Sequence, residues 1–419
     1  PENWIWIEMG KLVNIKNGFP FDSKLFSKNI SGKHPLIRIR DIVRGYTETF
    51  TDEECPEEYT IKKGDILIGM DGDFNVASWK GEDALLNQRV CCIDSASPYL
   101  DRRFLLYYLP IPLMKINEAT PSVTVKHLST KTLSITPIPI PPLAEQQRIV
   151  DRIESLFTKL DEAKEKILEV LDGYEPRKVA MLHLAFSGEL TKTWRKEYGI
   201  DLDSWKRLSV SELCKSLKYG TAKKSQAEGE IAVIRMGNLQ HGEINWNDLV
   251  YSSDKEDIEK YQLSPGDVLF NRTNSPALVG KTSIYRGNVP AIYAGYLIKL
   301  DYDHSRILGD YLNYALNTVD AKEYCNLVKT DGINQSNINA KKIGEYSFDV
   351  PSLNEQSEIV CILDEFFAKE AEAKAKVEAT LDAIEAMKKS ILAKAFRGEL
   401  GTNNPEDESV EELLKRTLV

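Results

Sequence analysis

Cysteine and histidine are both scarce in this chain of 419 residues. The six cysteines form no Cys-x-x-Cys pair, and they do not cluster with the five histidines along the sequence. Zinc sites and the disulfide frameworks of small secreted domains depend on such spacing. The sequence therefore predicts free thiols in a reducing compartment and no metal ion in this chain.

Long apolar runs are missing as well. No stretch approaches the roughly 20 apolar residues that a membrane span requires, and the start of the chain does not match a signal peptide. Hydrophobic residues make up 42% and charged residues 28%, as is typical of a globular protein. We therefore expect a cytoplasmic protein with no membrane partner.

Positive charge is in deficit. The formal net charge is −10 and the isoelectric point is near 5.3, whereas proteins that bind nucleic acid usually carry a basic excess. The acidic residues include two runs, 52–58 and 404–412, and the charged faces of the helical regions. A local basic surface is therefore compatible with the acidic total.

Two stretches resemble ligand loops, but each lacks a glycine that the loop requires. In 275–283 (SPALVGKTS), Ser275 stands where a phosphate-binding P-loop needs its first glycine. In 71–82, acidic residues have the spacing of a calcium loop, but Val76 replaces the glycine of its sharp turn. There is also no Gly-x-Ser-x-Gly elbow. The sequence predicts a binding protein that is not an enzyme.

The chain repeats itself. The segments 181–190 (MLHLAFSGEL) and 391–400 (ILAKAFRGEL) lie 210 residues apart, and 141–157 matches 351–367 at the same offset. Upstream matches, such as "KKGDILIGM" with "SPGDVLFNR", have offsets between 197 and 210. A constant offset suggests helices, and a variable one suggests loops of different length. A period this long corresponds to a whole domain followed by a long helical region, which we call an arm.

The predicted fold class is α+β with an internal pseudo-twofold repeat. Short β-rich runs such as "PLIRIR" and "LSITPIPI" predict strands of a mostly antiparallel or mixed sheet, and "RRFLLYYL" and "GDYLNYAL" predict short helices. Five segments follow along the chain: a mixed α/β domain at 1–142, a helical region at 143–190, a second mixed domain at 191–350, a long helix at 351–400 and an acidic tail at 401–419.

The two helical regions have the apolar spacing of a coiled coil. Steps of three and four residues separate the apolar positions, and Gly173 with Pro176 predicts a break in the first region. Glu370 interrupts the stripe of the second. We expect the two helices to pack on each other as an antiparallel coiled coil. The predicted seam consists of Ile149, Ile153, Leu156, Leu160, Ile167, Ile359, Leu363, Phe366, Val377, Leu381 and Ile384.

One loop has different polar residues in the two copies, although the strand before it matches. Residues 69–77 (GMDGDFNVA) align with 271–279 (NRTNSPALV), directly after a matched strand. A recognition loop would change its polar residues in this way, and so would an unconstrained surface loop. Both interpretations remain open at the level of sequence.

The arm motifs Pro-Leu-x-Glu-Gln and Ala-Phe-x-Gly-Glu-Leu resemble those of the specificity subunit of type I restriction–modification systems, over nearly the whole chain. The resemblance implies two target-recognition domains that bind the two halves of a split sequence in double-stranded DNA. It also implies helices that dock two methyltransferase (modification) subunits using S-adenosylmethionine, and restriction subunits using ATP and magnesium. No cofactor is expected in this chain. The alternatives are a protein-interaction scaffold that does not read DNA and a P-loop-like nucleotide hydrolase.

Candidate DNA contacts follow from the matched strand ends and loops. Arginine, lysine, asparagine, glutamine and aspartate are the side chains suited to phosphates and base edges. In the first domain they are Arg38, Arg40, Asp71, Asp73, Asn75, Lys126 and His127. In the second they are Arg235, Asn238, Arg272, Thr273, Asn274, Lys281, Asn334 and Gln335. For partner docking we expect the exposed faces of both arms and the segments around Phe186 and Phe396.

Overall fold

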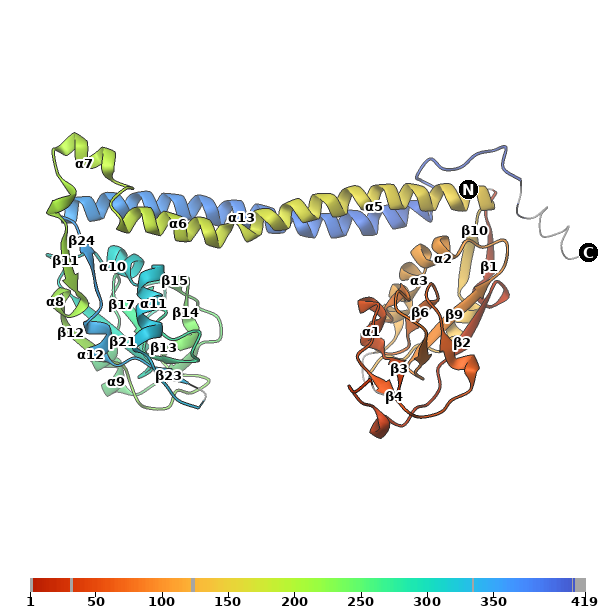
Figure 1. Ribbon diagram of the computed structural model, residues 1–419, viewed down its shortest axis with the longest axis horizontal. Helices are drawn as coiled ribbons and strands as arrows, with labels where there is room; N and C mark the ends of the chain where they lie inside the picture. The colour runs from red at the N-terminus through yellow and green to blue at the C-terminus, as the bar shows by residue number, and fades with distance from the viewer. Residues whose placement is uncertain (1–2, 31–32, 122–124, 334, 409, 411–419) are drawn as a thin grey trace, which may run out of the picture. The chain divides into compact units, whose positions relative to one another are not determined.

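A computed structural model describes residues 3–30, 33–121, 125–333, 335–408 and 410. The chain divides into two compact units (Figure 1): unit 1 comprises Pro1–Ile167 and Ala379–Val419, and unit 2 comprises Leu168–Glu378. Each unit therefore combines one of the expected mixed domains with parts of both helical regions. The compact units differ in this respect from the consecutive segments of the sequence.

Unit 1 contains small sheets of mixed direction. The first is antiparallel, in the order β2 (Val13–Asn17), β9 (Val90–Ala96), β6 (Ile66–Gly69) and β7 (Val76–Ser78). The second has the order β4 (Phe50–Thr51), β3 (His34–Ile37), β8 (Ala84–Leu86) and β5 (Thr60–Ile61), with β3 and β8 parallel. A pair joins β1 (Ile5–Glu8) to β10 (Pro137–Ile140).

Unit 2 repeats this plan with additions. Its main sheet has the order β12 (Cys214–Tyr219), β21 (Leu297–Tyr302), β17 (Val268–Asn271), β19 (Thr282–Ile284), β15 (Gly242–Ile244) and β14 (Leu239–Gln240). The second has the order β16 (Val250–Ser252), β13 (Ile231–Ile234) and β20 (Ala291–Tyr293), with β13 and β20 parallel. A third contains β18 (Thr273–Asn274), β23 (Ser336–Asn337) and β22 (Thr330–Asp331), and a pair joins β11 (Lys206–Ser209) to β24 (Ser347–Val350).

Short helices connect these strands. In unit 1 they are α1 (Ile39–Arg44), α2 (Arg102–Tyr108), α3 (Pro110–Ala119) and α4 (Thr130–Ile135). In unit 2 they are α7 (Lys192–Tyr198), α8 (Val210–Leu213), α9 (Lys255–Tyr261), α10 (Gly309–Ala315), α11 (Val319–Val328) and α12 (Ala340–Gly344). The expected helices correspond to α2 and α10. The strand expected over "LSITPIPI" is wrong in its first half, because the Ser129 hydroxyl accepts from the Thr132 N–H (3.1 Å) and caps α4 there.

The long helices are α5 (Leu143–Asp172), α6 (Tyr174–Phe186) and α13 (Leu353–Ala395). The expected break occurs at Gly173, between α5 and α6. Pro176 contributes to it because proline has no N–H to donate to the preceding turn. In the described part of the chain, no helix combines the length and apolar character needed to cross a membrane.

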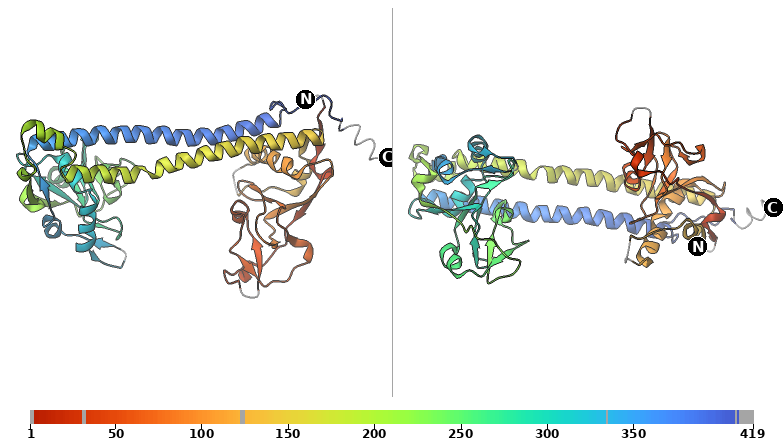
Figure 2. Two further views of the ribbon diagram at one scale, coloured as in Figure 1. Left: turned by 45° about the horizontal axis from the view of Figure 1, so that its top comes forward. Right: turned by 90° about the horizontal axis from the view of Figure 1, so that it is seen from below.

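Each unit contains the start of one helical region and the end of the other (Figure 2). In unit 1, Ile149 and Ile153 of α5 pack in the same core as Phe396, which follows α13. In unit 2, Ile359 of α13 packs in the same core as Leu182 of α6. The outer positions of the predicted seam are thus also domain-core residues. All the predicted seam residues are buried or half-buried.

Ion pairs join the neighbouring helices within each unit. In unit 1, Lys164 Nζ lies 2.6 Å from Glu385 Oε1, and Lys388 Nζ lies 2.5 Å from Asp161 Oδ1. Residue numbers fall along α13 as they rise along α5, so these helix segments run in opposite directions. In unit 2, Glu370 pairs with Arg177 of α6 at 3.0 Å. The interruption in the apolar stripe therefore has a charged partner.

The glutamine of each repeated Pro-Leu-x-Glu-Gln or Pro-Ser-Leu-x-Glu-Gln motif fastens a long helix to its domain. Gln146 Nε2 donates to the Tyr99 and Pro141 carbonyls at 2.8 and 2.9 Å, and its Oε1 accepts from the Asp101 N–H at 2.8 Å. Gln356 makes the equivalent bonds to the carbonyls of Arg306 and Pro351 and to the Leu308 N–H, at 2.9, 2.9 and 2.8 Å. Both glutamines are fully buried. The motif is a structural clamp.

The glutamate before each glutamine is fully buried as well. Glu145 accepts from Trp4 Nε1 at 3.1 Å and from Asn403 Nδ2 at 3.3 Å. Glu355 accepts from Trp205 Nε1 at 3.0 Å. It also accepts from Arg195 Nη1 and Thr191 Oγ1, both at 2.7 Å. Trp4 and Trp205 therefore occupy matching places in the two units, although Glu355 has a cationic partner and Glu145 has neutral donors.

Candidate nucleic-acid interface

The loop after β6 is a strained turn that a buried side chain anchors to the core. Phe74 has a positive φ of 52°, which is rare for a bulky residue, and its ring is buried in the core of unit 1. This anchor leaves Asp73 and Asn75 exposed on either side. Both line a hollow of about 380 Å³ that α3 borders through Asn117 and Glu118. The anchored turn thus presents predicted polar residues to solvent.

The segment 126–128 fastens the same turn. The Gly72 N–H donates to the Lys126 carbonyl at 3.0 Å, and Asn117 Nδ2 donates to the Gly72 carbonyl at 2.5 Å. Lys126 Nζ donates to Asn117 Oδ1 at 2.9 Å and to its carbonyl at 2.6 Å. The predicted lysine therefore supports the turn with its ammonium group.

Asp71 links two exposed side chains. His127 Nδ1 lies 2.8 Å from Asp71 Oδ1, and Arg89 Nη1 lies 3.5 Å from Asp71 Oδ2. The Asp71 side chain is 17% exposed, whereas those of Arg89 and His127 are 68% and 66% exposed. The structure brings the predicted Asp71 and His127 together with Arg89, which the sequence argument missed.

Unit 2 has the same frame after β17. Its Ile338 N–H donates to the Arg272 carbonyl at 2.8 Å, as the Leu128 N–H donates to the Met70 carbonyl at 2.7 Å in unit 1. Thr273 pairs in register with Asn337, whose Nδ2 donates to Thr273 Oγ1 at 2.8 Å. The predicted Thr273 thus has the place of Asp71.

A hollow of about 580 Å³ lies beside this pair and is rich in side-chain amides. Its walls include the predicted Arg235, Asn238, Asn274 and Lys281 together with Gln240, Asn245, Asn247 and Tyr296. Arg235 Nη2 donates to the Asp248 carbonyl at 2.8 Å, and Lys281 Nζ donates to Gln240 Oε1 at 2.9 Å. Burial lowers the pKa of Lys281, and the nearby Lys322 lowers it further.

Asn238 has a different role from the predicted one. Its side chain is 3% exposed, and its Nδ2 donates to the carbonyls of Asn245 and Asn247 at 3.0 and 3.1 Å. Its Oδ1 accepts from the Arg235 N–H at 2.9 Å. Because every polar atom of the side chain shapes the loop, we do not retain Asn238 as a DNA contact.

Three predicted arginines lie away from the turn tips. Arg38 is exposed at the start of α1, with its guanidinium 5.8 Å from the centre of the Phe26 ring. Arg40 Nη2 donates to Thr49 Oγ1 at 3.4 Å. Arg272 stacks over Tyr219 at 4.7 Å and donates to the Gly295 carbonyl at 3.3 Å.

The predicted Gln335 belongs to the turn between β22 (Thr330–Asp331) and β23 (Ser336–Asn337). Gln335 is exposed, and its carbonyl accepts from the Gly332 N–H at 2.7 Å. Asn334 lies outside the residues that the structure describes, as does most of the acidic tail expected at 401–419.

Neither ligand-like stretch has the geometry of its ligand site. β19 begins at Thr282, directly after Lys281, where a P-loop would continue into a helix. In the calcium-like stretch, the strands β6 and β7 flank the turn where a calcium-binding EF-hand would place helices. Within the described ranges there is no group of three or more histidine, cysteine, aspartate or glutamate side chains that could hold a metal ion.

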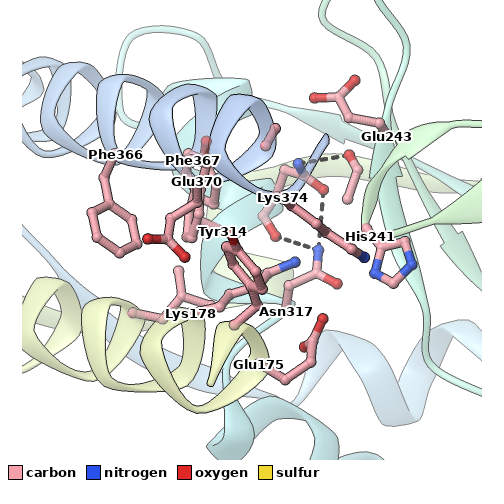
Figure 3. A pocket seen from close by; sticks show the side chains of 15 residues that line it. Glu175, Lys178, His241, Glu243, Tyr314, Asn317, Phe366, Phe367, Glu370 and Lys374 are labelled. Carbon is pink, nitrogen blue, oxygen red and sulfur yellow. Dashed lines mark hydrogen bonds between the residues drawn. The ribbon is translucent and has the colours of Figure 1, made fainter. Parts of the chain in front are cut away.

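Figure 3 shows a hollow of about 300 Å³ in unit 2, where α6, α10 and α13 meet the segment 241–243. Phe366 of the predicted seam lies on its wall. Burial lowers the pKa of Lys178, whose amine lies 5.6 Å from the centre of the Phe367 ring. The lining also contains Lys374, His241, Glu175, Glu243 and Glu370. Charges of both signs line the hollow, so it favours no ion of one sign.

The rings of Phe186 and Phe396, around which we expected a partner surface, pack toward the domain cores, and the neighbouring Leu184 is 42% exposed. The Phe396 ring lies edge-on to those of Phe104 and Tyr108, each at 5.1 Å between centroids. The Phe186 ring lies 5.0 Å from that of Tyr311. These aromatic contacts complete the cores of the units, which explains the twin Ala-Phe-x-Gly-Glu-Leu endings.

Comparison with known proteins identifies relatives along nearly the whole chain. Residues 1–172 and 203–381 match the family model described as "Type I restriction modification DNA specificity domain". The type I restriction enzyme EcoBI specificity subunit of Escherichia coli is 32% identical over 416 residues, covering 95% of this chain and 86% of that protein. The EcoKI specificity subunit of Escherichia coli (strain K12) is 25% identical, covering 96% of this chain and 90% of that protein.

Solved structures share the fold. A chain from a type I R-M system, studied for its complex assembly and conformational transition, has a TM-score of 0.70 at 20% identity and covers 96% of this chain and 99% of its own length. The HsdS subunit from Thermoanaerobacter tengcongensis has a TM-score of 0.55 at 21% identity, with coverage of 96% and 98%.

Proposed function

This chain belongs to the type I restriction–modification DNA specificity family, and we propose that it reads a two-part DNA sequence with one half-site for each unit. The observation that carries the proposal is the repeated frame at the loops after β6 and β17. Matched backbone bonds hold both loops, while the outward side chains differ. Two similar supports with different polar tips suit two different half-sites.

The long helices act in this proposal as the spacer between the readers. We propose that α5, α6 and α13 form one antiparallel coiled coil along both units, with the gap between half-sites set by its length. Three observations support this arrangement. The apolar residues have heptad spacing, ion pairs in unit 1 join segments of α5 and α13 that run in opposite directions, and α13 continues without a break for 43 residues.

The exposed faces of these helices are the proposed docking surface for two methyltransferase subunits and for restriction subunits. Their middle sections carry exposed charged residues such as Glu165, Lys166 and Glu372. One face of each helix end packs in a domain core.

We propose that the chain itself is not catalytic and holds no cofactor. S-adenosylmethionine would bind the methyltransferase subunits, and ATP with magnesium the restriction subunits. We also propose a cytoplasmic location, which the free cysteines support.

The net charge of −10 favours a second candidate, a protein-interaction scaffold that does not read DNA. Duplex binding by the chain together with its methyltransferase subunits separates the two. A DNA reader should lose affinity steeply as salt rises, because phosphate contacts release counterions. A scaffold would show neither measurable duplex affinity nor a salt dependence.

Mapping methylated adenines in cells with and without the gene tests the two-part target. We expect a motif of two defined parts with a fixed gap. Exchange of residues 1–140 for the corresponding domain of a relative should change one part only. A change in both parts would contradict the assignment of one half-site to each unit.

A further inference from the structure

Three backbone positions are equivalent in the two units, around the loop that follows β6 in unit 1 and the loop that follows β17 in unit 2. The Met70 N–H donates to the Arg89 carbonyl at 2.9 Å, and the Met70 carbonyl accepts from Leu128 at 2.7 Å. In unit 2, the Arg272 N–H donates to the Tyr296 carbonyl at 3.0 Å, and the Arg272 carbonyl accepts from Ile338 at 2.8 Å. The backbone frame therefore aligns two sets, which we call the reading triplets. They are Asp71, Arg89 and His127 in unit 1, and Thr273, Tyr296 and Asn337 in unit 2.

Strand registers confirm the alignment independently. Gly69 pairs with Val90 in unit 1, and Asn271 pairs with Leu297 in unit 2. Arg89 and Tyr296 directly precede Val90 and Leu297. The bridge between Asp71 and His127 likewise has the place of the pair formed by Thr273 and Asn337. The same three backbone positions thus carry different side chains in the two units.

The triplet of unit 1 presents donors on a fixed support. The Asp71 carboxylate is mostly buried and contacts both other members, so it acts as a positioning residue for Arg89 and His127. Because Arg89 Nη1 is directed at Asp71, its Nη2 and Nε can project outward as a pair. A paired guanidinium edge matches the O6 and N7 acceptors of guanine in the major groove.

The triplet of unit 2 is neutral. Asn337 uses one N–H for Thr273 Oγ1, and among the described residues its other N–H and its Oδ1 have no partner. An amide with one donor and one acceptor matches N7 and N6 of adenine. Tyr296, which is 48% exposed, lines the hollow described above.

We propose, on the basis of the proposed function, that the reading triplets determine specificity: Arg89 contacts a guanine in one half-site, and Asn337 contacts an adenine in the other. Asp71 sets the direction of Arg89 and His127. Thr273 sets the direction of the Asn337 amide. The two halves of the target differ because these side chains differ on one backbone frame.

The first test maps methylated sites in cells that carry the full complex with Arg89→Gln or Asn337→Ser. Arg89→Gln should reduce discrimination at one guanine by roughly tenfold or more, and Asn337→Ser should do the same at one adenine of the other half. Arg44→Gln is the matched control, because Arg44 is exposed in unit 1 but lies at the end of α1. It should leave the motif unchanged.

A second test uses modified DNA with the parent complex, so it does not depend on the assembly of a variant. The purified parent complex is titrated with duplexes in which single guanines are replaced by 7-deazaguanine, which lacks the N7 acceptor. One substitution in the half-site of unit 1 should weaken binding at least several-fold. The same substitution should have little further effect on the complex with Arg89→Lys, because the paired contact is already lost.

The positioning role of Asp71 has its own readout. Asp71→Asn should relax the same guanine as Arg89→Gln, whereas a merely structural role would lower methylation at all sites equally. An unchanged motif in the Arg89 and Asn337 variants, or relaxation of the same half by both, would overturn the inference. A parent protein without a two-part motif would instead refute the proposed function.

Discussion

The glutamine clamps of the two units are nearly superimposable in their hydrogen bonds, whereas the neighbouring glutamates differ. Gln146 and Gln356 each make three bonds whose lengths agree within 0.1 Å. Glu355 has an arginine partner, but Glu145 has neutral donors, and its Oε1 has no partner among the described residues. The fold requires the clamp that orients a long helix on its domain. The fold leaves more freedom in the partners of the neighbouring carboxylate, and most in the side chains of the reading triplets.

The largest expected difference between the units follows removal of the glutamates. Glu355→Ala leaves Arg195 buried without its carboxylate, so we expect unit 2 to lose about 3–5 kcal/mol of unfolding free energy. Glu145→Ala removes only an acceptor for neutral donors, and unit 1 should lose about 1–3 kcal/mol. Urea titration followed by hydrogen–deuterium exchange and mass spectrometry reports the two units separately.

The exposed Glu165 provides the control for that experiment. Glu165→Ala should change the unfolding free energy by less than about 0.5 kcal/mol in either unit. Equal losses for Glu145→Ala and Glu355→Ala would show that the ion pair to Arg195 does not distinguish the two sites.

The second prediction concerns the buried glutamine clamp that both units share. Gln146→Ala and Gln356→Ala each remove a fully buried side-chain amide and leave three backbone groups without its hydrogen bonds, so each should cost its unit about 2–3 kcal/mol. The same exchange measurement should find the two losses equal within about 0.5 kcal/mol. A marked inequality would mean that the clamps are less alike in energy than in geometry.

The third prediction uses alkaline pH. Burial raises the pKa of Tyr108 and Cys91 in unit 1 to about 12. Unit 2 has a larger set of groups whose pKa burial raises: Tyr293, Tyr302, Tyr311, Tyr314, Cys214 and Cys325. The stabilisation from these neutral groups is complete below their ordinary pKa values, near 9 for thiols and 10 for phenols, and is lost as pH rises through the raised values.

Unit 2 should therefore lose more stability than unit 1 between about pH 9 and 12. Limited proteolysis at pH 8 and pH 11, with mass spectrometry of the fragments, locates the first cleavages. We expect them in unit 2 at pH 11 only. Earlier cleavage of unit 1 at pH 11 would contradict the expected order.

The smallest effect is expected at the charged interruption of the apolar stripe. Arg177 and Glu370 are partly exposed, so Arg177→Ala should cost unit 2 less than about 1 kcal/mol. Replacing both residues with leucine should maintain or increase stability, since an apolar pair can fill the seam. Urea unfolding of both variants measures the difference, and a loss of more than about 2 kcal/mol in the double variant would refute this view.

Much of the framework could be predicted from sequence because repetition and periodicity are local signals. The helices at 143–172 and 353–395 and the break at Gly173 all follow from spacing and residue type. The strand over "LSITPIPI" was misassigned in part because a serine cap outweighed the β-rich composition.

The candidate site was predicted less completely. Asp71, His127 and Thr273 were chosen, and the structure places them in the reading triplets. Arg89, Tyr296 and Asn337 were missed, because none of them lies in the variable loop 69–77 or in its counterpart 271–279. Asn238 was chosen for its side-chain type, but its amide is turned inward to bond its own loop. Side-chain type gives the chemistry of a residue but not its direction.

The sequence by itself determined the duplicated plan, the long helices and the position of the variable loop, since each depends on residues close together in the chain or on copies compared directly. Only the tertiary structure decided that the end of one arm packs into the domain from which the other arm starts. Phe396, at the end of the second arm, packs in this way against Phe104 of the first domain. It also decided which polar side chains face solvent. Both outcomes depend on packing between residues far apart in the chain, which no local pattern encodes.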